Sequence, residues 1–423
     1  MKKSKHIILR SSFEIQLPDR EHAFFERFSD LFRTQILPVL DEALSKFGEE
    51  QTLYRMDRME LNLGQISLED PVLIREKLIS QIEDQLHLLA RPEQHALSLR
   101  LSQLELLFFF LKNGFFPWWT PGISRIEELE KSLQNEFPLQ NAGKSGEKAP
   151  PSSQWAPLAA LLKQDPQARL RLVFQFRRPF FLWLLQQVYS AENLRALQGR
   201  GIKDREKLLD ALVSESNAPI LAKPKPKKAV DLRKTQEKEP ALPVSVEPES
   251  SVEKALEDGI TASHAGIVLL HPFLSPFFTE LGLLKEERFI TQAAQVRAIH
   301  LLHFLATGQE SVDELQTPFY KLLCALPFSF PIRPRIRLHA KEKQEAEHLL
   351  RTVIGHWKIL KNTTIDGLRE GFLQRSGILR NEEKGFRLTV EQNSIDILLD
   401  RLPWGISVVK LPWMEKLIYV DWP

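Results

Sequence analysis

The chain of 423 residues contains a single cysteine, Cys324, and has almost no net charge. One cysteine excludes a disulfide within the chain and suits a reducing compartment. Lysine and arginine total 57 against 55 aspartate and glutamate residues, so the formal charge is only +2. No global positive charge is therefore available to condense on a polyanion, and we expect no nucleic-acid partner.

Long apolar runs are also absent. The longest, Leu106–Leu111 and Pro179–Leu185, are far shorter than the roughly 18 residues that a membrane-spanning helix needs. The basic start, Met1–Arg10, contains only a short apolar run, Ile7–Leu9, which is too small for the core of a secretory signal. The sequence thus predicts a soluble protein with no export signal and no direct membrane insertion.

The residues that are present suit a globular protein, with 43% hydrophobic and 26% charged side chains. The predicted class is α+β, mostly helical, in four parts. These are an N-terminal strand–helix–strand–helix unit over 1–92, a helical bundle over 93–213, a disordered linker over 214–260, and a C-terminal helical domain over 261–423 that ends in a small β meander.

Periodicity places the elements of the first part. Residues 6–17 and 53–66 alternate loosely and are rich in β-formers, which predicts two strands. Between them, apolar residues recur every three or four positions from Phe24 to Ile36, which predicts a helix that Pro38 kinks and Gly48 ends. A second helix is predicted over 70–89. Its expected buried side is formed by Leu73, Ile74, Leu78, Ile82, Leu86 and Leu89.

The next two parts differ sharply in composition. Helical segments are predicted at Leu99–Leu111, Arg125–Leu133, Leu158–Leu162, Arg169–Phe176, Phe180–Tyr189 and Lys203–Val213. From Ser214 to about Gly259, proline, lysine and glutamate replace the aromatic residues. Such a stretch buries too little apolar surface to offset its conformational entropy, which predicts the linker.

The C-terminal part combines both periodicities. Helices are predicted at His264–Leu270, Phe273–Leu281, Ala293–Thr307, Thr317–Ala325, Lys341–Leu360 and Asp366–Gln374. After Gly377 the pattern changes to short β-rich segments. The predicted strands are Phe386–Glu391, Ile406–Leu411 and Leu417–Trp422.

Residues capable of chemistry do not form a convincing set. A thiolate–imidazole pair would need Cys324 beside His271, His300 or His303, but the cysteine is surrounded by leucines, which favours a buried structural thiol. His300 and His303 share a helical spacing that suits two metal ligands, yet no third ligand lies nearby in the sequence. The glycines form no phosphate cradle. We expect no catalytic residue, no cofactor and no metal.

Tryptophan next to proline is the recurrent feature. Trp118 and Trp119 follow Pro117, while the other three pairs are Pro403 with Trp404, Pro412 with Trp413, and Trp422 with Pro423. Tryptophan provides a large contact area with few rotors and is enriched at interfaces. Two interpretations stay open, namely that these side chains fill the core or that they dock other subunits.

Several longer segments carry a family resemblance. They are Met56–Gly64 (MDRMELNLG), Leu107–Leu111 with Gly114 and Pro117–Trp119, His264–Leu274 (HAGIVLLHPFL), Leu305–Gly308 (LATG), Lys321–Pro327 (KLLCALP), Asp366–Gly377 (DGLREGFLQRSG), Leu402–Ile406 (LPWGI) and Leu411–Met414 (LPWM). Together they closely resemble the tape measure proteins of contractile injection systems, which are phage-tail-like particles. Asn62, His264, Tyr320 and Ala325 depart from the pattern, the first at a usual aspartate, the next two at usual asparagines and the last at a usual glycine.

The resemblance implies a non-enzymatic assembly protein that sets the length of the inner tube and the sheath. It implies tube and baseplate proteins as partners, and a cytoplasmic location during assembly that leaves open incorporation into the particle and self-association. The alternative is an assembly chaperone or baseplate plug of the same particle that does not measure length. The candidate interaction or motif residues are Trp118, Trp119, His271, Pro272, Phe273, Arg369, Arg375, Trp404, Trp413 and Trp422.

The residues limit how such a chain could measure length. One continuous helix would span about 635 Å at 1.5 Å per residue, but the 27 prolines and the two strand-bearing ends forbid it. We therefore expect compact end domains that bind baseplate or tube components. Length control would then involve several copies, unfolding, or a partner ruler.

Overall fold

A computed structural model describes residues 28, 30–46, 52–54, 59–64, 70–89, 96–117, 120, 125–138, 153–189, 191–199, 202, 204–215, 248–360 and 362–422. These residues belong to two compact units. Unit 1 comprises 1–107 and 118–123, and unit 2 comprises 108–117 and 124–423, so that the division falls within helix α4 (Leu99–Asn113). The predicted four-part division stays a prediction, and the mostly helical α+β class is confirmed.

Unit 1 contains two helices that pack through apolar faces. A π-helical segment, η1 (Phe32–Ile36), leads into α2 (Leu37–Lys46), and α3 (Pro71–Leu89) packs against them. The π turn precedes Pro38, which has no amide hydrogen to donate to the preceding turn. The buried residues of this core are Leu31, Ile36, Val39, Ala43, Ile74, Leu78 and Ile82.

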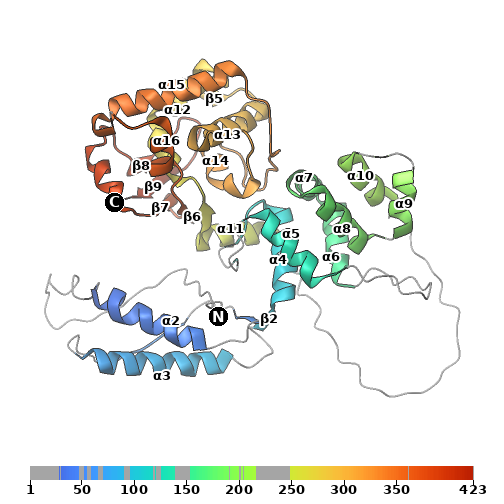
Figure 1. Ribbon diagram of the computed structural model, residues 1–423, viewed down its shortest axis with the longest axis horizontal. Helices are drawn as coiled ribbons and strands as arrows, with labels where there is room; N and C mark the ends of the chain where they lie inside the picture. The colour runs from blue at the N-terminus through green and yellow to red at the C-terminus, as the bar shows by residue number, and fades with distance from the viewer. Residues whose placement is uncertain are drawn as a thin grey trace. The chain divides into compact units, whose positions relative to one another are not determined.

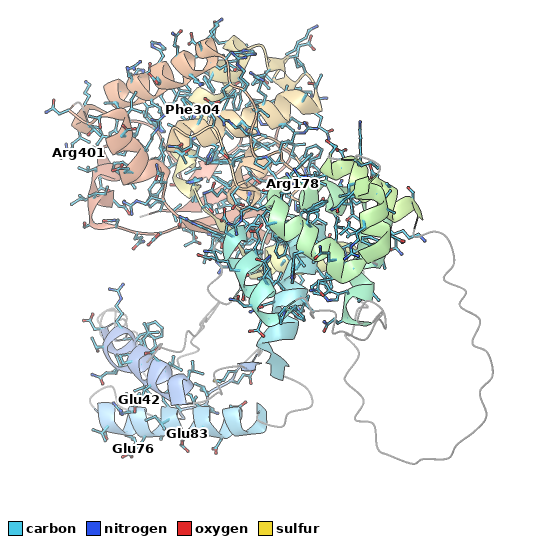
Figure 2. All side chains as sticks on the ribbon, turned by 45° about the vertical axis from the view of Figure 1, so that its right-hand side comes forward. Glu42, Glu76, Glu83, Arg178, Phe304 and Arg401 are labelled. Carbon is cyan, nitrogen blue, oxygen red and sulfur yellow. The ribbon has the colours of Figure 1, made fainter. Side chains whose placement is uncertain are left out.

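The outer face of α3 carries charge. Glu76 and Glu83 lie on its exposed side, away from α2 (Figure 2). Leu73, predicted to be buried, is 38% exposed, so the apolar stripe is narrower than the sequence suggested. Burial at Ile74, Leu78 and Ile82 shows that spacing by four residues fixes the packed face.

The strand predicted over 53–66 is described only in part. Leu53 and Tyr54 lie in β1 (Thr52–Tyr54), whereas residues 59–64, the other described residues of that range, have no regular structure. β1 pairs in antiparallel fashion with β2 (Ala96–Ser98), which the sequence did not predict. The strand predicted over 6–17 lies outside the described residues.

The middle of the chain is helical, as the spacing predicted. The helices are α4 (Leu99–Asn113), α5 (Ile126–Glu136), α6 (Ala156–Gln164), α7 (Pro166–Gln175), α8 (Arg178–Val188), α9 (Ala191–Gly199) and α10 (Arg205–Glu215). A short 3-10 turn, η2 (Ser153–Trp155), leads into α6. Prolines stand in the first turn of α6, α7 and α8, where the missing amide hydrogen costs nothing. Helix α9 was missed by the sequence analysis.

Most of the predicted linker, residues 216–247, lies outside the described residues. Its last part is ordered as α11 (Pro248–Asp258). Val252, Ala255 and Leu256 recur three or four residues apart, and they pack into the core of unit 2. The charged composition of this stretch concealed an amphipathic helix.

The C-terminal half is built from helices around one apolar core (Figure 1). The α-helices are α12 (His271–Glu280), α13 (Gln292–Thr307), α14 (Pro318–Leu323), α15 (Ala340–His356) and α16 (Ile365–Leu368). 3-10 and π segments join them, namely η3 (Ala265–Leu270), η4 (Glu314–Gln316), η5 (Lys358–Leu360), η6 (Arg369–Leu373) and η7 (Ser394–Arg401). Helix α13 is central, because its residues from Ala298 to Ala306 are all buried.

The C-terminal half also contains a small mixed sheet of five strands. The strands are β3 (Ile260–Ala262), β6 (Gly377–Glu382), β7 (Gly385–Val390), β8 (Val408–Val409) and β9 (Leu417–Asp421), in the order β3-β6-β7-β9-β8. The predicted meander is wrong in one respect: β7 and β9 run parallel, because η7 and the β8 segment intervene between them. A separate hairpin pairs β4 (Leu284–Lys285) with β5 (Arg288–Phe289).

No helix in the described parts of the chain combines enough length with enough apolar character to cross a bilayer.

Candidate functional site

Each C-terminal tryptophan among the candidates donates an indole hydrogen bond to another residue of the same chain. The indole Nε1 of Trp404 donates to the carbonyl of Leu269 at 3.0 Å, and that of Trp413 donates to the carbonyl of Leu323 at 2.8 Å. Both side chains are half-buried. Because a buried indole N–H needs an acceptor, these contacts fix the position of each ring against a distant segment. Their role in docking other subunits stays a prediction.

The candidates near the start of α12 pack against one of these rings. Phe273 meets Trp404 edge to face, with ring centroids 5.0 Å apart. His271 contacts the Val268 carbonyl through Nδ1 at 3.1 Å, and burial lowers the pKa of its imidazole. Pro272, between them, is exposed in the first turn of α12. Trp118 and Trp119 lie outside the described residues.

Arg369 caps the end of the central helix. Its Nε donates to the Leu305 carbonyl at 3.1 Å and its Nη2 donates to the Phe304 carbonyl at 3.2 Å, so two of the last carbonyls of α13 are satisfied. Nη1 forms an ion pair with Asp366 at 3.0 Å. The helix ends at Gly308, whose left-handed backbone (φ 74°) lies directly under the guanidinium. Two segments of the resemblance, Leu305–Gly308 and Asp366–Gly377, therefore meet here.

Arg375 and Trp422 are brought together by a residue that the sequence analysis missed. Asp396 accepts from Arg375 Nη2 at 3.1 Å through one oxygen. Its other oxygen accepts from Trp422 Nε1 at 3.2 Å and from the Asn393 amide at 2.7 Å. All three side chains, those of Arg375, Asp396 and Trp422, are buried. The network joins η6, η7 and the chain end, and no local sequence pattern indicated it.

Two departures from the family pattern also contact each other. The Tyr320 hydroxyl lies 2.7 Å from His264 Nδ1, and the two rings stack with centroids 5.7 Å apart. His303 completes the group, because its ring centroid lies 5.7 Å from that of His264 and 6.2 Å from that of Tyr320. Its Nε2 lies 2.9 Å from the Ser311 carbonyl. Burial lowers the pKa of His264, His300 and His303 to about 4 each, so these imidazoles are neutral near pH 7.

Cys324, His300 and His303, the residues considered as a nucleophile or as metal ligands, are buried in the core. Cys324 is fully buried, and burial raises the pKa of its thiol well above the usual value. Within the described residues, no hydrogen bond joins this thiol to an imidazole, and no group of three histidine, cysteine, aspartate or glutamate side chains is placed to hold a metal ion. His300 and His303 lie on the buried side of α13.

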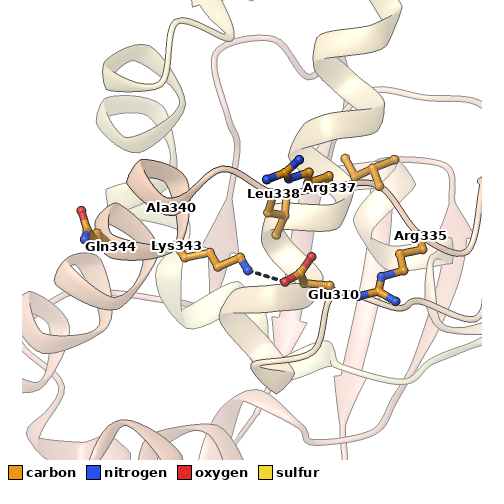
Figure 3. Close-up of a pocket in the computed structure, with 8 residues that line it drawn as sticks. Glu310, Arg335, Arg337, Leu338, Ala340, Lys343 and Gln344 are labelled. Atoms are coloured by element: carbon orange, nitrogen blue, oxygen red, sulfur yellow. Dashed lines mark hydrogen bonds and ion pairs between the residues drawn. The ribbon is translucent and has the colours of Figure 1, made fainter.

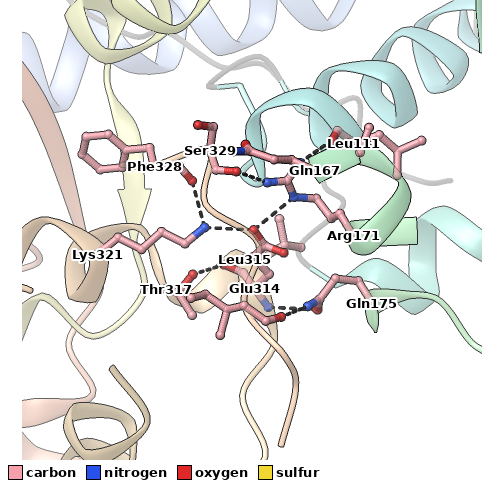
Figure 4. A network of polar contacts seen from close by, with 12 residues as sticks. Leu111, Gln167, Arg171, Gln175, Glu314, Leu315, Thr317, Lys321, Phe328 and Ser329 are labelled. Atoms are coloured by element: carbon pink, nitrogen blue, oxygen red, sulfur yellow. Dashed lines mark hydrogen bonds and ion pairs between the residues drawn. The ribbon is translucent and has the colours of Figure 1, made fainter. Parts of the chain in front are cut away.

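The most unusual feature is a fully buried charge network, which we call the Arg171 network (Figure 4). It consists of Arg171, Gln175, Glu314 and Lys321. Arg171 Nε lies 3.0 Å from Glu314 Oε1, and Lys321 Nζ lies 2.9 Å from the same oxygen. Each of these three charged side chains is 0% exposed. Two cations thus share one carboxylate oxygen inside the protein.

Backbone carbonyls complete the network. Arg171 donates Nη1 to the Leu111 carbonyl and Nη2 to the Ser329 carbonyl, while Lys321 donates to the Phe328 carbonyl at 2.8 Å. These acceptors offset part of the desolvation of the cations, although burial still lowers the pKa of Lys321 to about 8.

Gln175 and Gly114 extend the contact. Gln175 accepts from the Glu314 amide at 3.2 Å and donates to the Ile332 carbonyl at 2.6 Å. A β-carbon at Gly114 would lie 2.5 Å from Glu314 Oε1, so glycine leaves room for the carboxylate. Helix α7 is therefore bound to the segment from Glu314 to Ile332 through polar contacts between side chains of α7 and groups of that segment.

A sequence model described as contractile injection system tape measure protein matches the chain in two segments, residues 5–220 and 211–422. The matches cover nearly the whole chain, including α7 in the first segment and the Asp396 network in the second. The chain therefore belongs to the tape measure protein family of contractile injection systems. No curated protein and no solved structure matches it.

Proposed function

We propose that this protein acts during assembly of a contractile injection particle and sets the length of the inner tube and sheath through contacts with tube and baseplate subunits. The observation that carries the proposal is the family match over both segments of the chain, 5–220 and 211–422. The proposed role is structural and not enzymatic. The proposed location is the cytoplasm during assembly, with the finished particle as the alternative end point.

The fold supports a mechanism other than a single extended ruler. Helix α10 ends at Glu215 and α11 begins at Pro248, and both belong to unit 2. The Arg171 network further ties α7, which precedes residues 216–247, to the segment that follows them. Stretching 216–247 would therefore lengthen a loop that starts and ends in one compact unit. We propose that length control uses several copies, unfolding, or a partner ruler.

The test is removal of the gene followed by electron microscopy of the assembled particles. Tubes of uncontrolled length are expected, because the component that limits tube growth is missing. Loss of all tubes would instead favour an assembly chaperone or baseplate plug. Particles with their usual narrow length distribution would contradict both roles.

A second experiment separates the compact mechanism from a linear ruler. Residues 218–245 are deleted in one strain and replaced by a glycine–serine segment of equal length in another. We expect both strains to retain the original tube length, because the ends of the segment belong to one unit. Shortening only in the deletion strain would support the linear ruler.

A further inference from the structure

An open groove lies beside the start of α15, far in sequence from the candidate residues of the resemblance. It measures about 840 Å³ and is lined by the chain from Arg335 to Leu338, by the first turns of α15, and by Glu310 after α13. Figure 3 shows Lys343 and Arg335 on either side of Glu310, with Arg337 above it. Cationic side chains thus come from both sides of the groove.

The sequence around the groove alternates between cationic and apolar residues. Arg333, Arg335 and Arg337 occupy every second position before α15, and all three are exposed. Pro334 and Ile336 between them are half-buried, and Ile332 and Leu338 on either side are buried. In an extended chain, successive side chains point to opposite sides, so the arginines lie on the surface and the residues between them point inward. The segment therefore presents a row of positive charge over an apolar base.

The charges of the groove are only partly balanced. Lys343 forms an ion pair with Glu310, and the pKa of that carboxyl is lowered chiefly by the Lys343 hydrogen bond, with a smaller contribution from Arg335. In the described part of the chain, no carboxylate forms an ion pair with Arg335 or Arg337. The lining contains three cations, Arg335, Arg337 and Lys343, against one anion, Glu310, which leaves an excess of two positive charges (3 − 1).

The neighbouring charges do not cancel this excess. Arg297 pairs with Glu342 and donates Nη2 to the Arg337 carbonyl at 3.2 Å, so Glu342 is already occupied. Arg333 lies over the Phe174 ring, 5.0 Å from its centroid, and is itself a cation, so it adds to the excess. The two arginines of the lining remain available to a ligand.

The lining favours a carboxylate-bearing peptide over a nucleic acid. Guanidinium groups bind carboxylates in a bidentate geometry, and the half-buried Ile336 offers apolar contact between the two arginines. No aromatic side chain is among the residues that line the groove, so bases would have no stacking surface.

We propose that this groove binds an acidic, extended segment of a partner protein, with Arg335 and Arg337 as the main contacts. The incoming carboxylates pair with the two guanidinium groups, and the residue between them lies on Ile336. Alternating acidic and small apolar residues match the spacing of the row. The inference concerns this surface alone and does not depend on how tube length is set.

The test uses the full chain and a fluorescein-labelled peptide that alternates glutamate and alanine, with binding followed by fluorescence anisotropy. A matched peptide alternates glutamine and alanine. We expect binding of the acidic peptide only, weakened by salt, and a rise in Kd of at least about tenfold in the double variant Arg335→Glu/Arg337→Glu. The matched control, Arg401→Glu/Lys410→Glu, makes the same change of charge at exposed positions outside the groove and should leave Kd unchanged.

Other outcomes overturn the proposal. If both double variants weaken binding equally, the attraction depends on the net charge of the protein and not on the groove. If the acidic peptide does not bind at all, the groove is not a binding site for it. Tighter binding of a single-stranded oligonucleotide, lost in the Arg335→Glu/Arg337→Glu variant, would assign the groove to nucleic acid. Circular dichroism checks folding, and Arg335→Gln/Arg337→Gln, which removes charge without reversing it, serves if the first variant unfolds.

Discussion

Arg171 and Glu314 are 143 positions apart in the sequence, yet Nε of the arginine lies 3.0 Å from Oε1 of the glutamate inside the protein. The contact joins helix α7 to the C-terminal half of unit 2. A buried ion pair adds little stability compared with apolar residues of the same shape, but removal of one partner leaves the other charge uncompensated. We therefore expect the pair to matter more for which surfaces pack together than for overall stability.

Neutralising the shared carboxylate should destabilise unit 2 strongly. Glu314→Gln leaves Arg171 and Lys321 buried without a counter-charge, so we expect the free energy of unfolding to fall by about 3–5 kcal/mol. Urea denaturation followed by circular dichroism measures the change. Arg351→Met serves as the control, because Arg351 and Glu347 form an exposed i,i+4 pair whose loss should cost less than about 1 kcal/mol. Similar effects for the two variants would contradict the structural role of the Arg171 network.

The Asp396 network predicts a similar loss at the end of the chain. In Asp396→Asn, the amide nitrogen would face the Asn393 amide and the Trp422 indole or Arg375, all of which are donors. We expect a loss of about 2–4 kcal/mol in the free energy of unfolding. Chemical denaturation measures it. Asp400→Asn, at an exposed position of η7, is the matched control and should be nearly neutral; a neutral Asp396→Asn would contradict the network.

Ala325 predicts a stabilising substitution. It follows α14 with φ of 52°, in the left-handed region, and the Leu326 amide donates to the Lys321 carbonyl at 2.9 Å, as in a Schellman motif. Glycine is favoured at this position because an alanine β-carbon strains the backbone. Ala325→Gly should raise the free energy of unfolding by up to about 1 kcal/mol.

The control for this change has the opposite sign. Ala346→Gly, at a buried position inside α15, should lower the free energy of unfolding by about 1 kcal/mol or more, because glycine is a poor helix former and leaves a small void. Differential scanning calorimetry compares the two variants with the parent protein. A lower melting temperature for Ala325→Gly would show that the left-handed turn is not strained.

The buried histidines predict a loss of stability in mild acid. His264, His300 and His303 have folded pKa values of about 4, against about 6.5 in an unfolded chain. Between these values the unfolded state binds more protons, so the free energy of unfolding falls as pH drops from about 6.5 towards 4. We expect on the order of 2 kcal/mol per histidine between pH 7 and pH 5.

One carboxyl group opposes this trend. Burial raises the pKa of Asp313 to about 6, so Asp313 favours the folded state in mild acid, but it is one group against three. Urea denaturation at pH 7 and at pH 5 measures the difference, and His300→Leu should reduce it by the contribution of one histidine, on the order of 2 kcal/mol. Equal stability at the two pH values would show that the imidazoles are hydrated and not buried in the core.

The sequence singled out several candidate residues but not the residues that they contact. Arg369 and Arg375 were selected because they belong to a recognisable segment, and the structure places both among the buried polar contacts of the C-terminal half. Their partners were not predictable, because Asp396 and the carbonyls of α13 contribute no pattern near those arginines. Trp404 and Trp413 were selected for their proline neighbours, but their hydrogen-bond acceptors, Leu269 and Leu323, are distant in the sequence.

The sequence alone determined most of the helices but not α9 or α11, the packed positions Ile74, Leu78 and Ile82 of α3, the single buried cysteine and the family. Each of these depends on residues that lie close together along the chain. Only the tertiary structure decided that β7 and β9 run parallel, that His264 meets Tyr320, and that Arg171 reaches Glu314. The physical reason is that helical periodicity repeats every 3.6 residues and is visible locally. A contact between distant residues is selected by the packing of the whole core and leaves no periodic pattern in the sequence.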